Sequence, residues 1–258
     1  MIPVPAGLDG LFPPAAPVLF VHAHPDDETL STGALIAALT ASGRPCFVLT
    51  ATRGERGEVR AGVPADDLAA LREDEWRRAC AALGVAGHAF LGTPPARSAA
   101  PQRRYHDSGM VWLDAAETLA GPAPDAPGDA LTSADPAEVT ADVAAYARAV
   151  GARVLVTYDA AGGYGHPDHV FLHAPTRAAA SGLGVGFVAV VSQPRTAGEP
   201  VAAPAAGARW FDLAAHREAV VRALAAYASQ LRVDGADVVH VGGQREPIQL
   251  RIGVAAAR

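Results

Sequence analysis

Short apolar runs alternate along this chain with longer segments in which apolar residues recur every three or four positions. The short runs predict buried β-strands, and the longer segments predict amphipathic helices. Because strands and helices alternate as in βαβ units, the sequence predicts an α/β, Rossmann-like fold with a mostly parallel sheet flanked by helices. Strands are expected at 17–23, 46–52, 88–92, 153–159 and 186–191, and helices at 28–42, 66–83, 136–150 and 213–230.

Two stretches interrupt this alternation. Residues 120–136 and 193–209 are rich in Pro, Ala and Gly and show no periodicity. We interpret them as surface linkers, and the alternative is a mobile border to a cleft, because long loops in compact domains are either functional or disordered. Residues 1–192 are assigned to a Rossmann-like region, and residues 193–258 to a smaller C-terminal lobe that completes the same domain.

Composition narrows the class of protein. The chain has 258 residues, of which 50% are hydrophobic and 19% charged, so it can bury a sizeable core. A net charge of -6 without basic clusters argues against a nucleic-acid partner. The first residues lack the pattern of a signal peptide, and no apolar stretch is long enough to span a membrane, so we expect a cytoplasmic protein that does not bind membranes. The oligomeric state cannot be predicted.

Cys46 and Cys80 lie in a strand-like and a helical segment, which indicates small buried hydrophobes rather than a disulfide. Any metal must therefore be held by histidine and carboxylate.

Histidines and carboxylates gather directly after two of the predicted strands. The first group is HPDDE at 24–28, and the second is GGYGHPDH at 162–169. In open α/β sheets, ligands bind at the carboxyl ends of the strands, so we expect the active site there. Two imidazoles and one carboxylate from separate loops suit a catalytic Zn²⁺ or Fe²⁺ site that leaves positions open for water and substrate.

The residue types of each loop indicate which side chains could bind the metal and which could take part in the reaction. His24 and Asp27 could ligate from the first loop, because adjacent carboxylates on a turn cannot easily both face one ion. Asp26 is then free to accept a proton. In the second loop, one of His166 and His169 could ligate while the other faces the reacting bond.

HPDDE followed at a distance by HPDH resembles the paired motifs of the PIG-L/LmbE-like family of metal-dependent N-acetyl-sugar deacetylases. Within that family the chain is most similar to the mycothiol-pathway branch, which deacetylates N-acetylglucosaminyl-inositol. The similar stretches are VHAHPDDETLSTGA, GERGEV, ALGV, DSGM, VTYDAAGGYGHPDHV and ALAAYASQ.

The resemblance implies a role for each matching residue in hydrolysis of an N-acetylglucosamine glycoside. An amide is cleaved when a base, an acid and an electrophile act together. Asp168 could orient one of its neighbouring histidines. The resemblance implies His24, Asp27 and His169 as ligands of Zn²⁺ or Fe²⁺, Asp26 as base, Tyr164 as the group that stabilises the oxyanion, His166 as proton donor to the amine, Arg72 and Asp107 as sugar contacts, and Ser31 and Met110 as the lining of the inositol side.

Other interpretations remain open. The chain could be a mycothiol S-conjugate amidase, although that branch tends to carry lysine where this chain has Leu30. It could also be a sugar N-deacetylase from an antibiotic pathway. A non-catalytic carbohydrate-binding relic is the alternative of another class, yet such a relic should have lost Asp26 or a ligand.

The simpler structural interpretations are also weighed. Arg72 and Glu75 could be an i,i+3 pair on a helix, and Asp26 with Asp27 could be an acidic pair favoured at a helix N-terminus. His22 could belong to the core or support the site. The remaining histidines are interpreted as structural or solvated: His88, His106, His173, His216 and His240.

Overall fold

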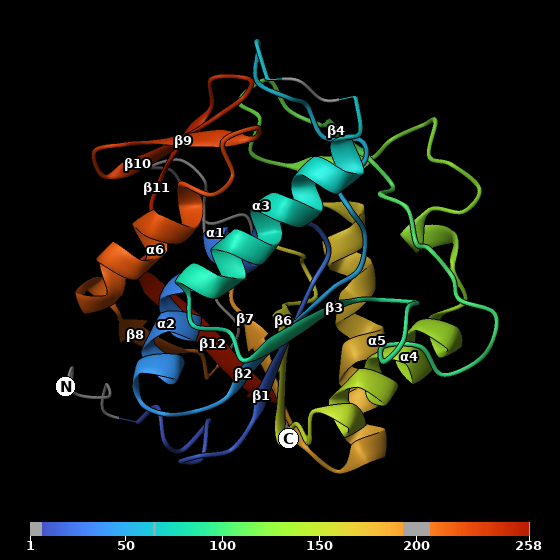
Figure 1. The fold of residues 1–258 in the computed structure, drawn as a ribbon, viewed down its shortest axis with the longest axis vertical. Helices are drawn as coiled ribbons and strands as arrows, with labels where there is room; N and C mark the ends of the chain where they lie inside the picture. Colours follow the sequence, from blue (N-terminus) through green and yellow to red (C-terminus); the bar gives the residue numbers. More distant parts are fainter. Residues whose placement is uncertain (1–6, 64–65, 193–206, 258) are drawn as a thin grey trace.

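The structure, a computed structural model, describes residues 7–63, 66–192 and 207–257. In these residues a seven-stranded sheet of order β3-β2-β1-β6-β7-β12-β8 forms the centre of the molecule (Figure 1). The first five strands run parallel and β12 is antiparallel to β7 and β8, which confirms the predicted mostly parallel sheet. The strands are β3 (Gly87–Phe90), β2 (Cys46–Thr50), β1 (Val18–His22), β6 (Val154–Tyr158), β7 (Gly186–Val190), β12 (Arg251–Ala257) and β8 (Arg209–Asp212).

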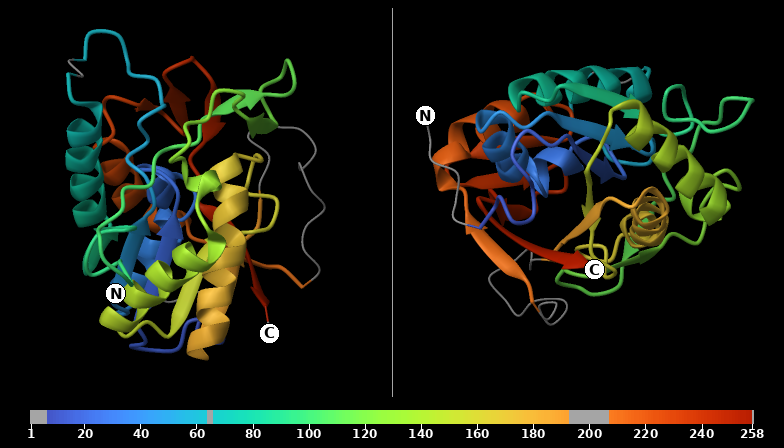
Figure 2. Two further views of the ribbon diagram at one scale, coloured as in Figure 1. Left: turned by 90° about the vertical axis from the view of Figure 1, so that its right-hand side faces the viewer. Right: turned by 90° about the horizontal axis from the view of Figure 1, so that it is seen from below.

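Helices cover both faces of the sheet, as the sequence predicts (Figure 2). Because side chains alternate along a strand, Val18 and Phe20 of β1 enter one buried cluster while Leu19 and Val21 enter the other. The first cluster is covered by α2 (Gly33–Ala41), α3 (Leu68–Ala82) and α6 (Arg217–Leu224), and the second by α4 (Pro136–Ala149) and α5 (Pro167–Leu183).

The register of the central strands positions the two histidine-containing loops. Val18 of β1 pairs with Cys46 of β2 on one side and with Val154 of β6 on the other. β1 and β6 are thus parallel neighbours, and the loops that follow them leave the same edge of the sheet. Residues distant in sequence therefore meet at this edge.

The expected helix at 28–42 is divided into α1 (Asp27–Leu30) and α2. Thr32 lies at the division, where its hydroxyl donates to the carbonyl of Glu28 (2.9 Å) and contacts Nε2 of His22 (2.9 Å). Hydroxyl side chains that bond to nearby backbone compete with helical hydrogen bonding.

The expected helix at 213–230 is also shorter. It consists of a 3₁₀ turn, η2 (Ala214–His216), and α6, which ends at Leu224. The segment that follows bonds to other parts of the chain: the Ser229 N–H and hydroxyl donate to the Glu75 carboxylate at 2.8 and 2.6 Å. These tertiary bonds outweigh the helical periodicity.

Several strands were not expected from the sequence. β8 and β12 extend the central sheet, β4 and β5 form a two-stranded sheet, and a three-stranded sheet has the order β11-β10-β9. Residues 120–136 thus contain β5 and a 3₁₀ turn, η1 (Leu131–Ser133), rather than linker alone, whereas 193–206 of the other expected linker lie outside the described residues. The bounds are β4 (Met110–Trp112), β5 (Ala120–Pro122), β9 (Leu231–Asp234), β10 (Asp237–His240) and β11 (Arg245–Pro247).

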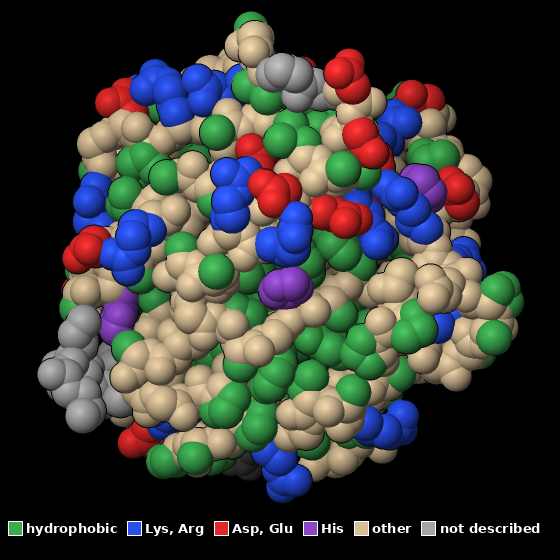
Figure 3. All heavy atoms as spheres, in the orientation of Figure 1, with side chains coloured by type: hydrophobic (Ala, Val, Ile, Leu, Met, Phe, Trp, Pro, Cys, Tyr) green, Lys and Arg blue, Asp and Glu red, His purple; other side chains and the backbone are tan. Residues whose placement is uncertain are grey.

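Among the described helices, none combines the length and apolarity needed to cross a bilayer. On the face drawn in Figure 3, acidic and basic side chains lie interspersed over the upper half, so that face presents no wholly basic patch.

Candidate metal and active site

The first loop makes a tight turn directly after β1. Asp26 has a φ of 122°, a conformation that L side chains rarely adopt. Its N–H donates to the Glu28 carboxylate (3.2 Å), and its carbonyl accepts from the N–H groups of Thr29 and Leu30 (both 2.9 Å). This strained turn is held by local hydrogen bonds, and it brings Asp26 to the wall of a pocket.

The second loop leads from β6 into α5. Gly162, Gly163 and Gly165 have φ values of 68°, 71° and 88°, which glycine adopts without strain. His166 caps α5, because its Nδ1 accepts from the Asp168 N–H at 3.2 Å. His169 follows three residues later, so both imidazoles lie on one side of the helix start.

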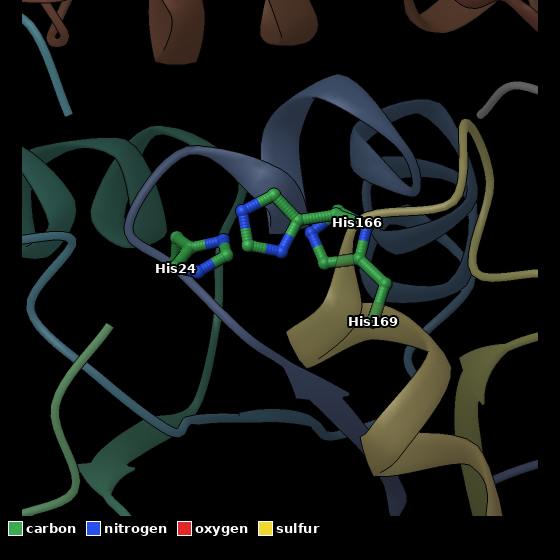
Figure 4. A group of neighbouring side chains, drawn as sticks. All are labelled: His24, His166 and His169. Carbon is green, nitrogen blue, oxygen red and sulfur yellow. The ribbon is translucent and has the colours of Figure 1, made fainter. Parts of the chain in front are cut away.

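The two loops meet at the carboxyl ends of β1 and β6. Figure 4 shows the rings of His24, His166 and His169 pointing toward one another, the first from the loop after β1 and the other two from the start of α5. Their nearest ring nitrogens all lie within 4.8 Å of one another. Asp27 joins this group, because its Oδ2 lies 3.2 Å from Nδ1 of His24 and 3.2 Å from Nε2 of His169.

These residues fit a divalent metal ion. The buried Nε2 atom of His169 faces Oδ2 of Asp27 at 3.2 Å without a well-aligned hydrogen bond, an arrangement in which both atoms can bind one ion. Burial raises the pKa of Asp27, but His169 and His24 outweigh this effect and hold the pKa well below its usual range. Asp27 is therefore a carboxylate, the form that binds metal.

The neighbouring histidines have opposite shifts. Burial lowers the pKa of His24, but the carboxylates of Asp107, Asp168 and Asp27 raise it well above the ordinary value. Burial, followed by the charges of His24 and His169, lowers the pKa of His166 to about 2. The neutral form of His166 is thus favoured when no ion is bound.

The structure gathers more candidate ligands than one ion needs. His166 belongs to the three-histidine group, and a second group combines His24 and His166 with Asp107 and Asp168. Asp168, expected to orient one of its neighbouring histidines, contacts His24 of the other loop through Oδ2 (3.1 Å). The division into ligands and catalytic groups therefore stays a prediction.

Tyr158 is a supporting residue that the sequence analysis did not identify. Its hydroxyl donates to Oδ2 of Asp27 (2.8 Å), and its ring stacks on His169 with centroids 4.0 Å apart. The available signal was its position at the end of the predicted strand 153–159. His22, assigned to the core or to support of the site, is fully buried and contacts the Tyr158 hydroxyl through Nδ1 (3.3 Å).

The C-terminal half of the chain also supports the first loop. The Tyr227 hydroxyl donates to the Glu28 carboxylate (2.6 Å), and the Gln230 side chain donates to the carbonyl of Pro25 (3.2 Å). Since Glu28 in turn accepts from Asp26, the segment after α6 contacts the turn that carries the candidate base. In the sequence, the only signal for this supporting role was the similarity of the stretch ALAAYASQ to the family.

A pocket of about 520 Å³ opens over the site. This volume lies within the range of about 300–1,000 Å³ that is usual for small-molecule sites. Tyr164 and the predicted substrate contacts all line it, namely Ser31, Arg72, Asp107 and Met110.

Arg72 and Glu75, both on α3, bond to different segments of the chain. Its guanidinium donates to the carbonyls of Gly54 and Glu58, the second at 3.1 Å, while Glu75 accepts from Ser229. The buried Nε of Arg72 has no hydrogen-bond partner. These contacts therefore do not include the i,i+3 pair that Arg72 and Glu75 could have formed on the helix.

The histidines interpreted as structural differ in position. His88 packs on Trp76 with ring centroids 4.5 Å apart, and Nδ1 of His173 contacts the carbonyl oxygen of Tyr158 (2.9 Å). His240 differs from these, because it lines the pocket together with the candidate catalytic residues.

A family model described as PIG-L, GlcNAc-PI de-N-acetylase, matches residues 19–180, a range that contains both loops. The chain belongs to this family. It is 47% identical over 163 residues to the 1D-myo-inositol 2-acetamido-2-deoxy-alpha-D-glucopyranoside deacetylase of Kineococcus radiotolerans, covering 62% of this chain and 43% of that protein. It is 42% identical over 175 residues to the protein of the same name in Actinosynnema mirum, covering 65% and 56%. The chain thus spans about half the length of these relatives.

Solved structures share the fold. A deacetylase of the teicoplanin biosynthesis pathway, in complex with teicoplanin, matches with a TM-score of 0.59 at 18% identity and covers 94% of this chain and 99% of that one. The N,N'-diacetylchitobiose deacetylase of Pyrococcus horikoshii matches with a TM-score of 0.53 at 17% identity, covering 85% and 74%. At such identities the likeness shows the α/β fold alone.

Proposed function

We propose that this PIG-L family member is a metal-dependent hydrolase that removes the acetyl group from an N-acetylglucosamine glycoside, releasing acetate and a free amine. The observation that carries the proposal is the convergence of His24 and Asp27 of the pocket wall with the buried His169, beside Asp26 in the same wall. The names of the relatives support N-acetylglucosaminyl-inositol, in mycothiol biosynthesis, as the substrate.

His24, Asp27 and His169 would hold the ion, with Zn²⁺ as the first candidate and Fe²⁺ as the second, because both suit two imidazoles and a carboxylate. When bound, such an ion polarises a carbonyl and lowers the pKa of a coordinated water to about 7. Tyr158 and Asp168 hold Asp27 and His24 in orientation through the hydrogen bonds described above.

The remaining chemistry falls to side chains of the same pocket. Asp26 accepts the proton of the attacking water. Tyr164 donates a hydrogen bond to the carbonyl oxygen as that oxygen becomes negative. His166, neutral at rest, takes up the proton that the attacking water gave to Asp26 and passes it to the nitrogen, because an amine leaves only when it is protonated.

The sugar would be bound by the residues that line the pocket around these groups. Arg72 and Asp107 both line the pocket, where a guanidinium can donate to one sugar hydroxyl and a carboxylate can accept from another. Ser31 and Met110 would line the side toward the aglycone.

The alternatives receive less support. A non-catalytic relic would lack part of the constellation, and this chain keeps all of it. Neither named relative is an S-conjugate amidase, and the similarity to antibiotic-pathway deacetylases is one of fold.

Release of free amine by the metal-loaded protein tests the proposal. Three substrates are compared: N-acetylglucosaminyl-inositol, a mycothiol S-conjugate and methyl N-acetylglucosaminide. We expect the first to react fastest, and the Asp26→Ala variant to be inactive on all three. Preferred cleavage of the S-conjugate would contradict the proposed substrate, and cleavage of none by a metal-loaded protein would contradict the deacetylase assignment.

A further inference from the structure

The loop between β6 and α5 carries two of the candidate catalytic groups, Tyr164 and His166. His166 is fixed by the start of α5, where its Nδ1 accepts from the Asp168 N–H. Tyr164 instead lies in the stretch 162–165, whose other three residues are glycines. Glycine restricts the backbone least of all residues, so the position of Tyr164 depends on contacts that hold this loop from outside.

Two neighbouring strands of the central sheet end beside this loop. β6 and β7 are parallel, and their pairing continues past β6, because the Asp159 N–H donates to the carbonyl of Val190 (3.0 Å). Asp159 is the first residue after β6, and Ser192 lies two residues after the end of β7. Val190 and Ser192 both line the pocket. The two strand ends are thus part of the carboxyl edge of the sheet at which the candidate site lies.

The side chains of Asp159 and Ser192 form a bridge between these strand ends. Oδ2 of Asp159 accepts from the Ser192 N–H (2.7 Å), and Oδ1 accepts from the Ser192 hydroxyl (2.7 Å). Hydrogen bonds to a carboxylate are stronger than those between neutral groups. Contact at two points also fixes the orientation of the carboxylate relative to β7.

The same bridge holds the loop. Oδ1 of Asp159 also accepts from the N–H groups of Ala161 and Gly162, at 3.0 and 3.1 Å. The Ser192 hydroxyl, which donates to Asp159, accepts in turn from the N–H of Gly163 (3.0 Å). Three consecutive N–H groups, the last of them next to the tyrosine, are therefore bonded to the bridge.

Tyr164 is held on its other side as well. Its carbonyl accepts from the N–H of Ala120 in β5 (2.8 Å), and its ring lies nearly perpendicular to that of His169, with centroids 5.4 Å apart. The direction of the phenol hydroxyl thus follows from the backbone of the loop. A displacement of about 1 Å in a reacting geometry can lower a rate about 10²-fold, so the bonds that hold this backbone affect catalysis.

We infer that Asp159 and Ser192 are positioning residues for the reaction, and that their bridge holds Tyr164 where its hydroxyl meets the carbonyl oxygen of the acetamide. They act through the loop and do not touch the reacting atoms. The inference rests on the proposed function, because it concerns the group that stabilises the oxyanion. A bridge that were merely structural would contribute to stability without a specific effect on the step that Tyr164 assists.

Two variants open the bridge, and a third is their control. Asp159→Ala removes the carboxylate, whereas Ser192→Ala removes only the hydroxyl between that carboxylate and Gly163. Ser98→Ala is matched to Ser192→Ala, because the hydroxyl and N–H of Ser98 also donate to one carboxylate, that of Asp142, at 2.8 and 2.7 Å. Neither residue of this second pair lines the pocket.

The kinetic constants for N-acetylglucosaminyl-inositol give the first test. We expect kcat to fall about 10–100-fold in Asp159→Ala and by a smaller factor in Ser192→Ala. KM and metal content should stay close to those of the wild type, because the lost interaction is one made in the transition state. Ser98→Ala should keep kcat within about twofold. Unchanged kcat in both Asp159→Ala and Ser192→Ala would overturn the inference.

Tyr164→Phe identifies the group through which the bridge acts. In that background the hydroxyl is already absent, so Asp159→Ala should lower kcat by no more than about a further twofold. An equal fall in the two backgrounds would mean that the bridge does not act through Tyr164, which would overturn the inference.

Hydrogen exchange separates this inference from the proposed function. The amides of residues 161–163 should exchange faster in Asp159→Ala than in the wild type, and Ser98→Ala should leave them unchanged. An inactive wild-type protein loaded with metal would refute the proposed function. The exchange rates would then decide the bridge alone, because faster exchange supports its hold on the loop and unchanged exchange overturns it.

Discussion

Oδ2 of Asp27 lies 3.2 Å from Nε2 of His169, although the two residues belong to loops at opposite ends of a long stretch of sequence. The contact exists because β1 and β6 are parallel neighbours, so the loops that follow them meet at one edge of the sheet. The Tyr158 hydroxyl then bonds to the same carboxylate oxygen at 2.8 Å. The candidate ligand Asp27 is thus oriented by the strand that leads to the other candidate ligand, His169.

The adjacent aspartates should separate metal binding from turnover. Asp27→Ala removes the carboxylate between His24 and His169, so we expect the purified protein to lose its metal. Asp26→Ala should retain metal and lose turnover by about 10²–10⁴-fold, as for removal of a general base. Metal content by elemental analysis, measured with kcat on the same samples, checks both. If both variants hold metal equally well, the ligand assignment is wrong.

The two histidines of the second loop allow a parallel comparison. We predict that His169→Ala loses metal affinity, whereas His166→Ala binds metal as the wild type does and loses kcat. The three ring nitrogens lie within 4.8 Å of one another, so the comparison is demanding. Titration of the apo-proteins with Zn²⁺ gives the affinities. Equal loss of affinity in the two variants would make His166 a ligand and leave the proton donor to be found elsewhere.

The sequence predicted the position of the candidate site better than it predicted the strands of the periphery, and the reason is physical. Runs such as 153–159 are long and apolar, and the HPD loops directly follow them, so periodicity located both strands and loops. β4, β5 and β11 have three residues each and contain or adjoin Gly and Pro, which leaves no period to detect. β12 lies in the sheet through antiparallel pairing with β7, a long-range contact that no local pattern contains.

Support from distant segments was likewise beyond sequence reasoning. Glu28 was visible as part of HPDDE, but its partner Tyr227 is fully buried after α6, where a continuous helix was expected. The break in that helix arises from tertiary hydrogen bonds such as those of Ser229 with Glu75. These bonds form only once both segments pack together.

Tyr227→Phe should therefore affect turnover as well as stability. It removes the hydroxyl that donates to Glu28, whose carboxylate also holds the N–H of Asp26. We expect kcat to fall about tenfold with metal content unchanged, because supporting residues of a site typically contribute 10–100-fold.

The matched control for this variant is Tyr105→Phe. Tyr105 also donates from a buried hydroxyl to a carboxylate, that of Asp142, at 3.0 Å. Both variants should lower the free energy of unfolding by about 1 kcal/mol in urea titrations. Only Tyr227→Phe should lower kcat, and an equal effect of the two on kcat would contradict a positioning role for Tyr227.

Asp142 should be important for stability without contributing to the reaction. It is fully buried and accepts hydrogen bonds from the N–H of Ser98 (2.7 Å), the hydroxyl of Tyr105 (3.0 Å) and the guanidinium of Arg97 (3.0 Å). Asp142→Ala leaves these donors unsatisfied, so we expect a loss of about 3 kcal/mol or more in the free energy of unfolding.

Glu218→Ala is the comparison for Asp142→Ala. Glu218 pairs with Arg222 at 2.6 Å in an exposed i,i+4 arrangement, which should contribute below about 1 kcal/mol. Urea unfolding of the two variants checks the difference. Comparable losses would mean that the buried network around Asp142 is worth no more than a surface pair.

Removal of the metal should lower thermal stability, because an ion that binds only the folded state stabilises that state. At a free Zn²⁺ concentration about 100 times the Kd, the stabilisation is about 2.7 kcal/mol, which raises Tm by several degrees. A chelator should abolish this increase in Tm in the wild type, and added Zn²⁺ should restore it. Asp26→Ala should show the same shift, since that residue is not assigned as a ligand, whereas Asp27→Ala should show little or none. A full shift in Asp27→Ala would mean that the ion is held by the other group of candidate ligands, in which Asp107 and Asp168 replace Asp27 beside His24.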